Sequence, residues 1–245
     1  MTQAVVLLSG GLDSSTLLWH VAKTLGPNSI FALSFDYGQK HVKEMACASF
    51  QAQQVGAVEH HRITLSCFRD LIAGASALTD AHLPIPSLDA LTHDQLDQPP
   101  TYVPNRNMAL LSLACAYAEA KDCQQVYYGA QLQDQYGYWD CTVKFLERLN
   151  ATLALNRRKA VQVLAPFATL KKADIITQGL ALGVDYSQTW SCYRGAAAAC
   201  GVCPTCVERL LAFEQAGCRD PVVYEADTQP CACPEHHPEK PDKHA

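Results

Sequence analysis

The chain has 245 residues, of which 49% are hydrophobic and 18% are charged, and its formal net charge is −5. This composition is typical of a folded globular protein with one large core, alone or with a small appended lobe. No apolar run approaches the roughly 18 residues that a membrane-spanning helix needs, and no signal peptide precedes the first expected strand. We therefore expect a cytoplasmic protein that binds no membrane, and the acidic balance without a long basic run predicts no nucleic-acid partner.

The first expected element is a buried strand over Ala4–Leu8, an apolar run rich in β-branched residues. The turn Ser9–Ser15, with the sequence Ser-Gly-Gly-Leu-Asp-Ser-Ser, leads into a helix that stops at Gly26-Pro27. Two consecutive glycines let the backbone adopt a positive φ and approach a ligand closely. The free N–H groups at the start of the helix favour an anion, so we expect the turn to bind one.

The same turn excludes two common phosphate-binding motifs. A Walker A loop needs a lysine after the glycines, and the dinucleotide fingerprint needs a third glycine where this chain has Ser14. The run resembles instead the pyrophosphate loop, Ser-Gly-Gly-x-Asp-Ser, of the ATP pyrophosphatase superfamily, whose members cleave ATP between the α- and β-phosphates. Asp13 or Ser14 can cap the helix, and an ordinary tight turn with a serine cap is the alternative interpretation.

The second expected strand, Ile30–Phe35, ends in the polar cluster Asp36–His41, at the end of the strand where open α/β sheets bind ligands. A solvated loop is the alternative for this cluster. A helix to about Val55 and a third strand, His61–Leu65, follow. Prolines and polar residues then interrupt any periodicity from about Ser76 to Pro100, which predicts a long loop over the ligand edge of the sheet.

The segment Tyr102–Asn107 precedes a strong helix, Met108–Ala120. Asn105 or Asn107 can cap that helix, and Arg106 then lies near a terminus that favours anions. Because arginine suits the recognition of a carboxylate or phosphate, we expect a binding role for it. A plain cap beside an exposed arginine is the alternative.

A fourth strand is expected over Val126–Ala130, followed by Gln131–Cys141, where aromatic rings alternate with amide and carboxylate groups. Such a segment is suited to stacking on a planar heterocycle and hydrogen-bonding it. A surface loop whose rings pack on the core is the alternative. A helix over Val143–Leu153, a fifth strand over Val161–Ala165 and a helix that opens at Lys171 complete the pattern.

Five short strands that alternate with helices predict an α/β fold with a five-stranded parallel sheet covered by helices on both faces. We expect a nucleotide-binding domain over residues 1–185, a zinc-binding lobe over 186–226 and a disordered tail over 227–245. The carboxyl ends of parallel strands lie at one edge of the sheet. That edge should gather Ser9–Ser15, Asp36–His41, Asn105–Asn107 and Gln131–Cys141.

Four cysteines, Cys192, Cys200, Cys203 and Cys206, have the spacing C-x7-C-x2-C-x2-C. Four thiolates form a closed tetrahedral zinc site, which implies a structural role. An iron–sulfur cluster would require a redox or sulfur-transfer role, and a redox C-x-x-C would require a thioredoxin-like unit, and nothing else in the sequence supports either. A second group of potential ligands is interpreted only as part of the tail: Cys231, Cys233, His236 and His237.

The motifs occur in one order that resembles a single family. They are the pyrophosphate loop, Phe35–Gln39, Pro104–Asn107, Tyr138–Cys141, Trp190–Tyr193 and Cys200–Cys206. Together they resemble the 7-cyano-7-deazaguanine synthases, the nitrile-forming enzymes of queuosine precursor biosynthesis, over about Val5 to Pro221. The chain departs from the usual Tyr-Pro-Asp-Cys of that family because Trp139 replaces the proline.

The resemblance implies an adenine nucleotide alpha hydrolase-like fold, ATP with Mg²⁺, one structural Zn²⁺, ammonium as nitrogen donor, 7-carboxy-7-deazaguanine as substrate, and a homodimer. It implies that the zinc ligands are the four cysteines above. Residues beside the matching motifs are candidates for catalysis: Ser9, Asp13, Lys172 and Arg194. The nucleotide is expected to contact Leu8, Ser9, Gly10, Gly11, Leu12, Asp13, Ser14, Ser15, Asp36, Tyr37, Gln39, Arg106, Asn107 and Asp140.

Two other functions compete with this one. A pyrophosphate-loop enzyme that modifies tRNA would want a basic RNA surface, which the acidic balance disfavours. A zinc-ribbon module that binds nucleic acid would need no intact phosphate loop, yet the loop here is intact.

Overall fold

The computed structural model describes residues 2–26, 28–40, 42–92, 94–95, 98–194 and 197–225. Some expectations concern positions outside these ranges: the helix stop at Pro27, His41, and the tail over 227–245 with Cys231, Cys233, His236 and His237.

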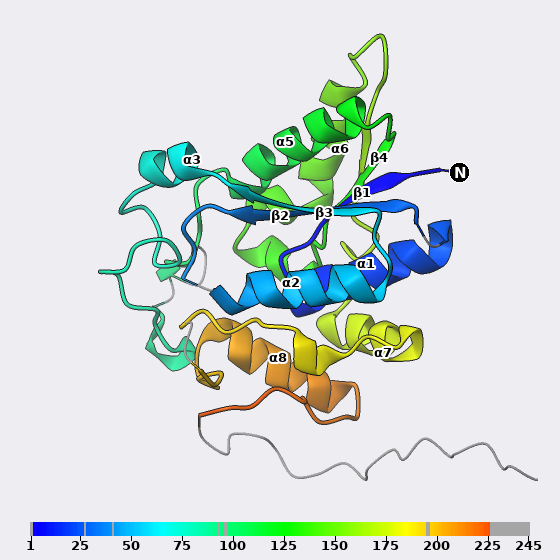
Figure 1. Cartoon of the computed structure of the whole chain (residues 1–245). Coiled ribbons are helices and arrows are strands. Elements are labelled where there is room, and N and C mark those ends of the chain that lie inside the picture. The colour runs from blue at the N-terminus through cyan, green and yellow to red at the C-terminus, as the bar shows by residue number, and fades with distance from the viewer. Residues whose placement is uncertain are drawn as a thin grey trace, which may run out of the picture.

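A five-stranded sheet forms the centre of the protein (Figure 1). Its strands are β1 Ala4–Leu7, β2 Ile30–Asp36, β3 Glu59–Thr64, β4 Gln125–Tyr127 and β5 Gln162–Leu164. They lie in the order β3-β2-β1-β4-β5, and every neighbouring pair is parallel. The predicted parallel sheet of five strands is therefore confirmed.

Helices cover both faces of the sheet (Figure 1). On one face are α5 Arg106–Ala120 and α6 Val143–Leu153, and on the other are α1 Leu12–Leu25, α2 Val42–Gln54 and α7 Lys172–Leu182. A last helix, α8 Pro204–Gln215, packs beside α7. A short helix, α3 Ser66–Leu71, follows β3. Neither α3 nor α8 was expected from the sequence pattern.

The side chains of β1 alternate between two hydrophobic clusters, as the period of two in a strand requires. Val5 packs with Leu111 and Ala114 of α5 on one face. Val6 packs with Leu17 and Leu18 of α1 on the other. Because both faces are covered, the central strands are apolar along their whole length, which explains why the run at Ala4–Leu8 was readable as a buried strand.

The chain order reverses beside β1, which fixes the position of the binding site. After β1 the chain proceeds to β2 and β3 on one side of it, and β4 and β5 occupy the other side. The chain therefore leaves β1 and β4 toward helices on opposite faces of the sheet, and the carboxyl ends of these two strands are the usual ligand position in open α/β sheets.

The end of the fourth strand differs from the sequence expectation. The run Val126–Ala130 predicted a longer fourth strand, but β4 ends at Tyr127. The reason is that Gly129 leaves the ladder to lie against α1, so close that a Cβ there would be 3.2 Å from the N of Ser14. Glycine at this position therefore allows the loop after β4 to approach the loop after β1.

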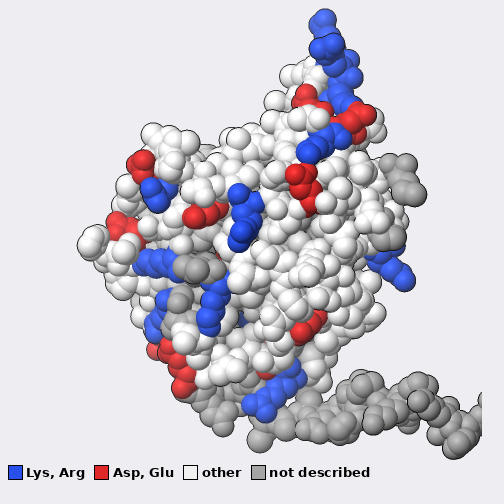
Figure 2. Space-filling view, in the orientation of Figure 1, with Lys and Arg blue, Asp and Glu red and all other residues white. Residues whose placement is uncertain are grey.

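Charged side chains of both signs are scattered over the face in Figure 2, and blue ones gather at the projecting tip that Figure 1 shows between α6 and β5. Arg157, Arg158 and Lys159 belong to that segment, and Lys159 pairs with Asp122. Among the helices of the described residues, none combines the length and apolarity needed to cross a bilayer.

Candidate active site

A cavity of about 590 Å³ lies at the carboxyl ends of β1, β2 and β4. Volumes of about 300–1,000 Å³ are usual for small-molecule sites. The wall contains the loop after β1, the first turns of α2 and α5, the loop after β4, and Lys172 at the start of α7. The long loop that was expected to cover the sheet edge does so, through Leu78, Pro86, Leu88, Leu91, Gln95, Pro99 and Pro100.

The loop after β1 is shaped by packing against α2. Gly10 has a φ of +87°, and a Cβ at this position would overlap the backbone carbonyl oxygen of Glu44. Glycine at position 10 is thus required by the close approach of α2 as well as by the left-handed backbone. Gly11 is the N-cap of α1, so Asp13 and Ser14 lie inside its first turn and the expected side-chain cap is absent.

The hydroxyl groups of the same loop bind one another. Ser9 Oγ lies 2.9 Å from Ser14 Oγ and accepts a hydrogen bond from Gly11 N at 3.2 Å. Ser14 Oγ also accepts a hydrogen bond from Ser9 N at 3.2 Å. These contacts fix the loop in one conformation, with the N-terminus of α1 directed at the cavity.

Lys172 lies at the centre of a group of carboxylates beside this loop. Its ammonium Nζ is 2.9 Å from Glu208 Oε2 and 3.9 Å from Asp13 Oδ2, and the residue is only 8% exposed. Burial alone would lower the pKa of Lys172, but Asp13, Glu208 and Asp134 outweigh burial and raise it above its ordinary value. The lysine is therefore a permanent cation at the phosphate loop.

Two carboxylates of this group, Asp13 and Asp134, have raised pKa values for a different reason, which is burial. Burial raises the pKa of Asp13, although Lys172 acts to lower it. Burial likewise raises the pKa of Asp134 to about 6, again against the effect of Lys172. Asp13 Oδ1 is buried and has no hydrogen-bond partner among the described residues. Three carboxylates around one ammonium leave an excess of negative charge at this end of the cavity, which a metal cation would neutralise.

The other end of the cavity is aromatic, and the cation that lines it among the described residues is Arg106. Its Nη1 donates a long hydrogen bond of 3.5 Å to Tyr37 Oη, and its guanidinium carbon lies 6.0 Å from the centre of the Tyr138 ring. Burial acts to lower the pKa of Arg106, but Tyr37, Tyr193 and Tyr138 raise it further above its ordinary value. Arg106 is therefore a charged donor in an aromatic environment, as expected of a residue that binds an anion or a carbonyl oxygen.

Glu44, in the first turn of α2, lines the same cavity as Arg106. Burial raises its pKa to about 8, although Arg106 acts to lower it. No pattern in the sequence pointed to Glu44 as a residue of the site, or to Glu208 as a partner of Lys172. Neither residue belongs to a local motif, and both reach the cavity only because α2 and α8 pack around the sheet edge.

Most of the expected binding residues line the cavity: Leu8, Ser9, Gly11, Leu12, Asp13, Ser14, Tyr37, Gln39, Arg106, Asn107 and Lys172. The rest are not among its lining residues: Gly10, Ser15, Asp36, Asp140 and Arg194. The buried carboxylate of Asp140 accepts a hydrogen bond from Asn107 N at 2.9 Å and so caps α5 in place of the asparagine side chains expected there. Asp36 and Arg194 are exposed, and their roles stay predictions.

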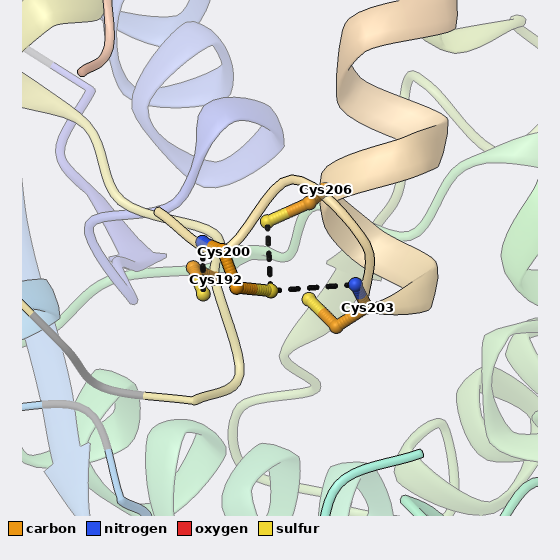
Figure 3. Close-up of side chains that lie close together, drawn as sticks. All are labelled: Cys192, Cys200, Cys203 and Cys206. Carbon is orange, nitrogen blue, oxygen red and sulfur yellow. Dashed lines mark hydrogen bonds between the residues drawn. The ribbon is translucent and has the colours of Figure 1, made fainter. Parts of the chain in front are cut away.

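The four cysteines of the C-x7-C-x2-C-x2-C pattern converge in one buried cluster (Figure 3). Their sulfur atoms all lie within 4.8 Å of one another, and each cysteine is free of disulfide bonds. Cys200 N and Cys203 N donate to neighbouring sulfurs at 3.4 and 3.3 Å, as the backbone of a metal-binding knuckle does. The cluster is therefore able to bind a metal ion, and a closed set of four thiolates fits tetrahedral zinc.

The segment Thr189–Cys192, here named the strap, connects this cluster to the loop after β1. Trp190, which lies two residues before Cys192, donates a hydrogen bond of 3.0 Å from its N to Gly10 O. The buried guanidinium of Arg209 binds Thr189 Oγ1 at 2.9 Å and pairs with Asp220 at 2.6 Å. The cysteine cluster and α8 thus hold the strap against the loop after β1.

The parallel sheet, its crevice and the loop after β1 define an α/β nucleotide-binding protein of the pyrophosphate-loop class. The family model described as "Queuosine biosynthesis protein QueC" matches residues 3–217. The chain belongs to the QueC family.

Curated relatives agree with this assignment. The chain is 44% identical to a protein from Colwellia psychrerythraea named 7-cyano-7-deazaguanine synthase 1, over 91% of this chain and 99% of the relative. It is 44% identical to a 7-cyano-7-deazaguanine synthase from Psychromonas ingrahamii, over 91% of this chain and 98% of the relative. A solved NMN synthetase from Francisella tularensis has a TM-score of 0.47 and 16% identity, covering 78% of this chain and 65% of that one, which is too weak to inform function.

Proposed function

We propose that this chain is a 7-cyano-7-deazaguanine synthase, which converts 7-carboxy-7-deazaguanine and ammonium into the corresponding nitrile. ATP is consumed, and AMP and pyrophosphate are released. Membership of the QueC family supports this proposal, and one structural observation carries it: the loop Ser9–Ser15 and the buried cation Lys172 face one cavity of small-molecule size.

The first half of the reaction turns a poor electrophile into a good one. A carboxylate oxygen of the substrate attacks the α-phosphorus of ATP, and pyrophosphate leaves toward the loop after β1. Ammonia then attacks the acyl adenylate, AMP departs with the carboxylate oxygen, and a proton is released as the amide forms. Backbone N–H groups at the start of α1 and the ammonium of Lys172 stabilise the negative charge that develops on pyrophosphate.

The second half removes the remaining oxygen. The amide oxygen attacks the α-phosphorus of a second ATP, and pyrophosphate leaves as before. Loss of two protons and of AMP, which carries the amide oxygen, gives the nitrile. Each nitrile therefore requires two ATP. This order uses the same phosphate-binding end of the cavity twice, with the base kept in place.

Two metal ions belong to the proposal. Mg²⁺ would arrive with ATP, and the unpartnered Asp13 Oδ1 is an oxygen ligand of the hard type that Mg²⁺ prefers. Zn²⁺ would be held by the four cysteines and would supply structural support to the strap. A homodimer in the cytoplasm, and the division into domains over 1–185 and 186–226, are further parts of the proposal, and sedimentation of the purified chain tests the first.

A stoichiometry measurement tests the function. The purified chain is given 7-carboxy-7-deazaguanine, ammonium and Mg·ATP, and AMP, pyrophosphate and nitrile are quantified. We expect two AMP and two pyrophosphate per nitrile, and Asp13→Asn should lower the rate far more than the melting temperature. ADP and phosphate as products, or no nitrile, would contradict the proposal. Salt-dependent binding of tRNA by the wild type, without turnover of the free base, would favour a tRNA-modifying enzyme.

A further inference from the structure

The carboxylates that line the cavity fall into two groups. Asp13, Asp134 and Glu208 surround Lys172 and raise its pKa. Glu44 also lines the cavity, but its pKa is affected, after burial, only by Arg106. The first group interacts with the cation at the phosphate end, whereas Glu44 is not among the residues that act on the pKa of Lys172.

Glu44 is held in place without a partner for its side chain. Among the described residues, its carboxylate makes no hydrogen bond and no ion pair within 4.0 Å, although the residue is partly buried. Its backbone is fixed, because its carbonyl oxygen packs directly on Gly10. The neighbouring Lys43 does not neutralise it, since the Lys43 ammonium lies over the Trp190 ring at 4.2 Å and donates to Ala197 O. A positioned carboxyl group that lacks hydrogen bonds is available to a ligand, and N–H donors of that ligand would lower its pKa and stabilise the carboxylate.

The proposed substrate offers a matching set of groups. One edge of a guanine-like ring carries a carbonyl oxygen, a ring N–H and an amino group side by side, which are one acceptor and two donors. A carboxylate accepts two parallel hydrogen bonds and a guanidinium donates to a carbonyl oxygen. Building on the proposed function, we propose that Glu44 and Arg106 together recognise this edge of the deazaguanine, with Glu44 accepting from the ring N–H and the amino group and Arg106 donating to the carbonyl oxygen.

The two ends of the cavity are consistent with that orientation. The carboxylate of the substrate must reach the α-phosphorus, so it lies toward Lys172 and the loop after β1. The ring N–H and the amino group lie farther from the carboxylate and point toward Glu44, whereas the carbonyl oxygen, next to the carboxylate, points toward Arg106. Tyr37 and Tyr138 both contact the Arg106 guanidinium, and both line the cavity. Their rings provide apolar surface for the flat base.

Ligand binding without ATP tests this assignment. Two probes are compared by calorimetry: 7-carboxy-7-deazaguanine and the analogue in which hydrogen replaces the 2-amino group. The wild type should bind the guanine-type probe roughly 10- to 100-fold more tightly, as expected for hydrogen bonds to a charged group. Glu44→Gln should lose that preference, because it should bind the guanine-type probe more weakly and the analogue as before. Glu214→Gln, on the exposed face of α8, should retain the preference.

Each outcome decides for or against the inference. A Glu44→Gln protein that keeps the wild-type preference would overturn it while leaving the proposed function intact. If the wild type produces no nitrile, and Glu44→Gln abolishes the preference for the guanine-type probe, the proposed function is contradicted and the recognition site is supported. A substrate-binding role predicts that Glu44→Gln raises KM more than it lowers kcat and leaves the melting temperature at pH 8.5 at or above that of the wild type. A Glu44→Gln protein that fails to fold would overturn the inference, because it would assign Glu44 a structural role.

Discussion

The two ends of the cavity handle charge in different ways. At the phosphate end, Lys172 is paired with Glu208 at 2.9 Å, and Asp13 and Asp134 lie close enough to raise its pKa. At the aromatic end, Arg106 acts to lower the pKa of Glu44, and the two residues form no ion pair. The phosphate end is thus a preassembled ionic cluster, whereas at the aromatic end Arg106 makes one long hydrogen bond and the Glu44 carboxylate has no partner among the described residues.

This difference follows from what each end would bind. A triphosphate brings its own charge and its own Mg²⁺, so fixed charges suffice to receive it. A neutral base has to be recognised by hydrogen bonds, and polar groups that are already paired cannot make them. Selectivity for the base therefore depends on Glu44 and Arg106. The following substitutions distinguish the roles of the two ends of the cavity.

The largest effect should come from the cysteine cluster, which supports the strap beside the phosphate end. Removing a structural zinc forfeits on the order of 10 kcal/mol of binding energy that is coupled to folding. Cys200→Ser or Cys203→Ser should therefore lower metal content and solubility together, as measured by elemental analysis and thermal melting. Cys67→Ser, at an exposed isolated cysteine, is the control and should change neither. Undiminished stability of the metal-free protein would refute a structural site.

The second largest effect should come from removing the cation at the phosphate end, Lys172. Lys172→Met leaves three carboxylates without their counter-charge beside the departing pyrophosphate, so kcat should fall on the order of 1,000-fold. Binding of the deazaguanine base alone should change much less, because the base lies at the other end. The adjacent and exposed Lys171→Met is the matched control and should retain activity. Equal losses in the two variants would mean that Lys172 does not face the nucleotide.

The two glycines of the loop should differ in a way that sequence does not show. Gly10→Ala should destabilise the fold by roughly 3 kcal/mol, because the new methyl group overlaps the α2 backbone at a positive φ. Gly11→Ala should be tolerated, since its φ is −76° and its nearest neighbour, Ser9 Oγ, lies 3.3 Å away. Urea unfolding of both variants measures the difference. Similar stabilities would show that α2 does not pack on Gly10.

The smallest effect concerns the stability of the aromatic end. The pKa of Glu44 rises from 4.5 to about 8 on folding, so its contribution to stability is complete below pH 4.5 and is lost as the pH rises through about 8. The charged group that acts on it is Arg106 from α5, and Glu44 in turn raises the pKa of Cys47 on its own helix. Glu44→Gln should thus be more stable than the wild type by ~1 kcal/mol at pH 9, because partial contact with water reduces the penalty, and equal to it near pH 4.5. The reverse order at pH 9 would contradict the burial of an unpaired carboxylate.

Much of the fold could be predicted from the sequence because its signals are local. Apolar runs marked the strands, and Gly10 and Gly11 marked the turn between β1 and α1. The four cysteines converge as their spacing indicated. In each case the residues that determine the structure are neighbours in the chain, so spacing alone carries the information.

The rest of the site depends on contacts between distant elements. Glu44 and Glu208 reach the cavity from α2 and α8, which no spacing rule connects. The role of Asp140 as the cap of α5 depends on a contact across 33 positions of the chain. The reason for glycine at position 10 is also tertiary, because it is the neighbouring helix, beside any phosphate, that excludes a side chain there.

Transfer of oxygen from substrate to AMP tests the proposed reaction most directly. The chain is given 7-carboxy-7-deazaguanine with ¹⁸O in both carboxylate oxygens, together with ammonium and Mg·ATP, and the products are examined by mass spectrometry over time. Two successive adenylations predict that each AMP carries one ¹⁸O and that the amide appears before the nitrile. Label recovered in water, or ADP and phosphate as the nucleotide products, would contradict this mechanism.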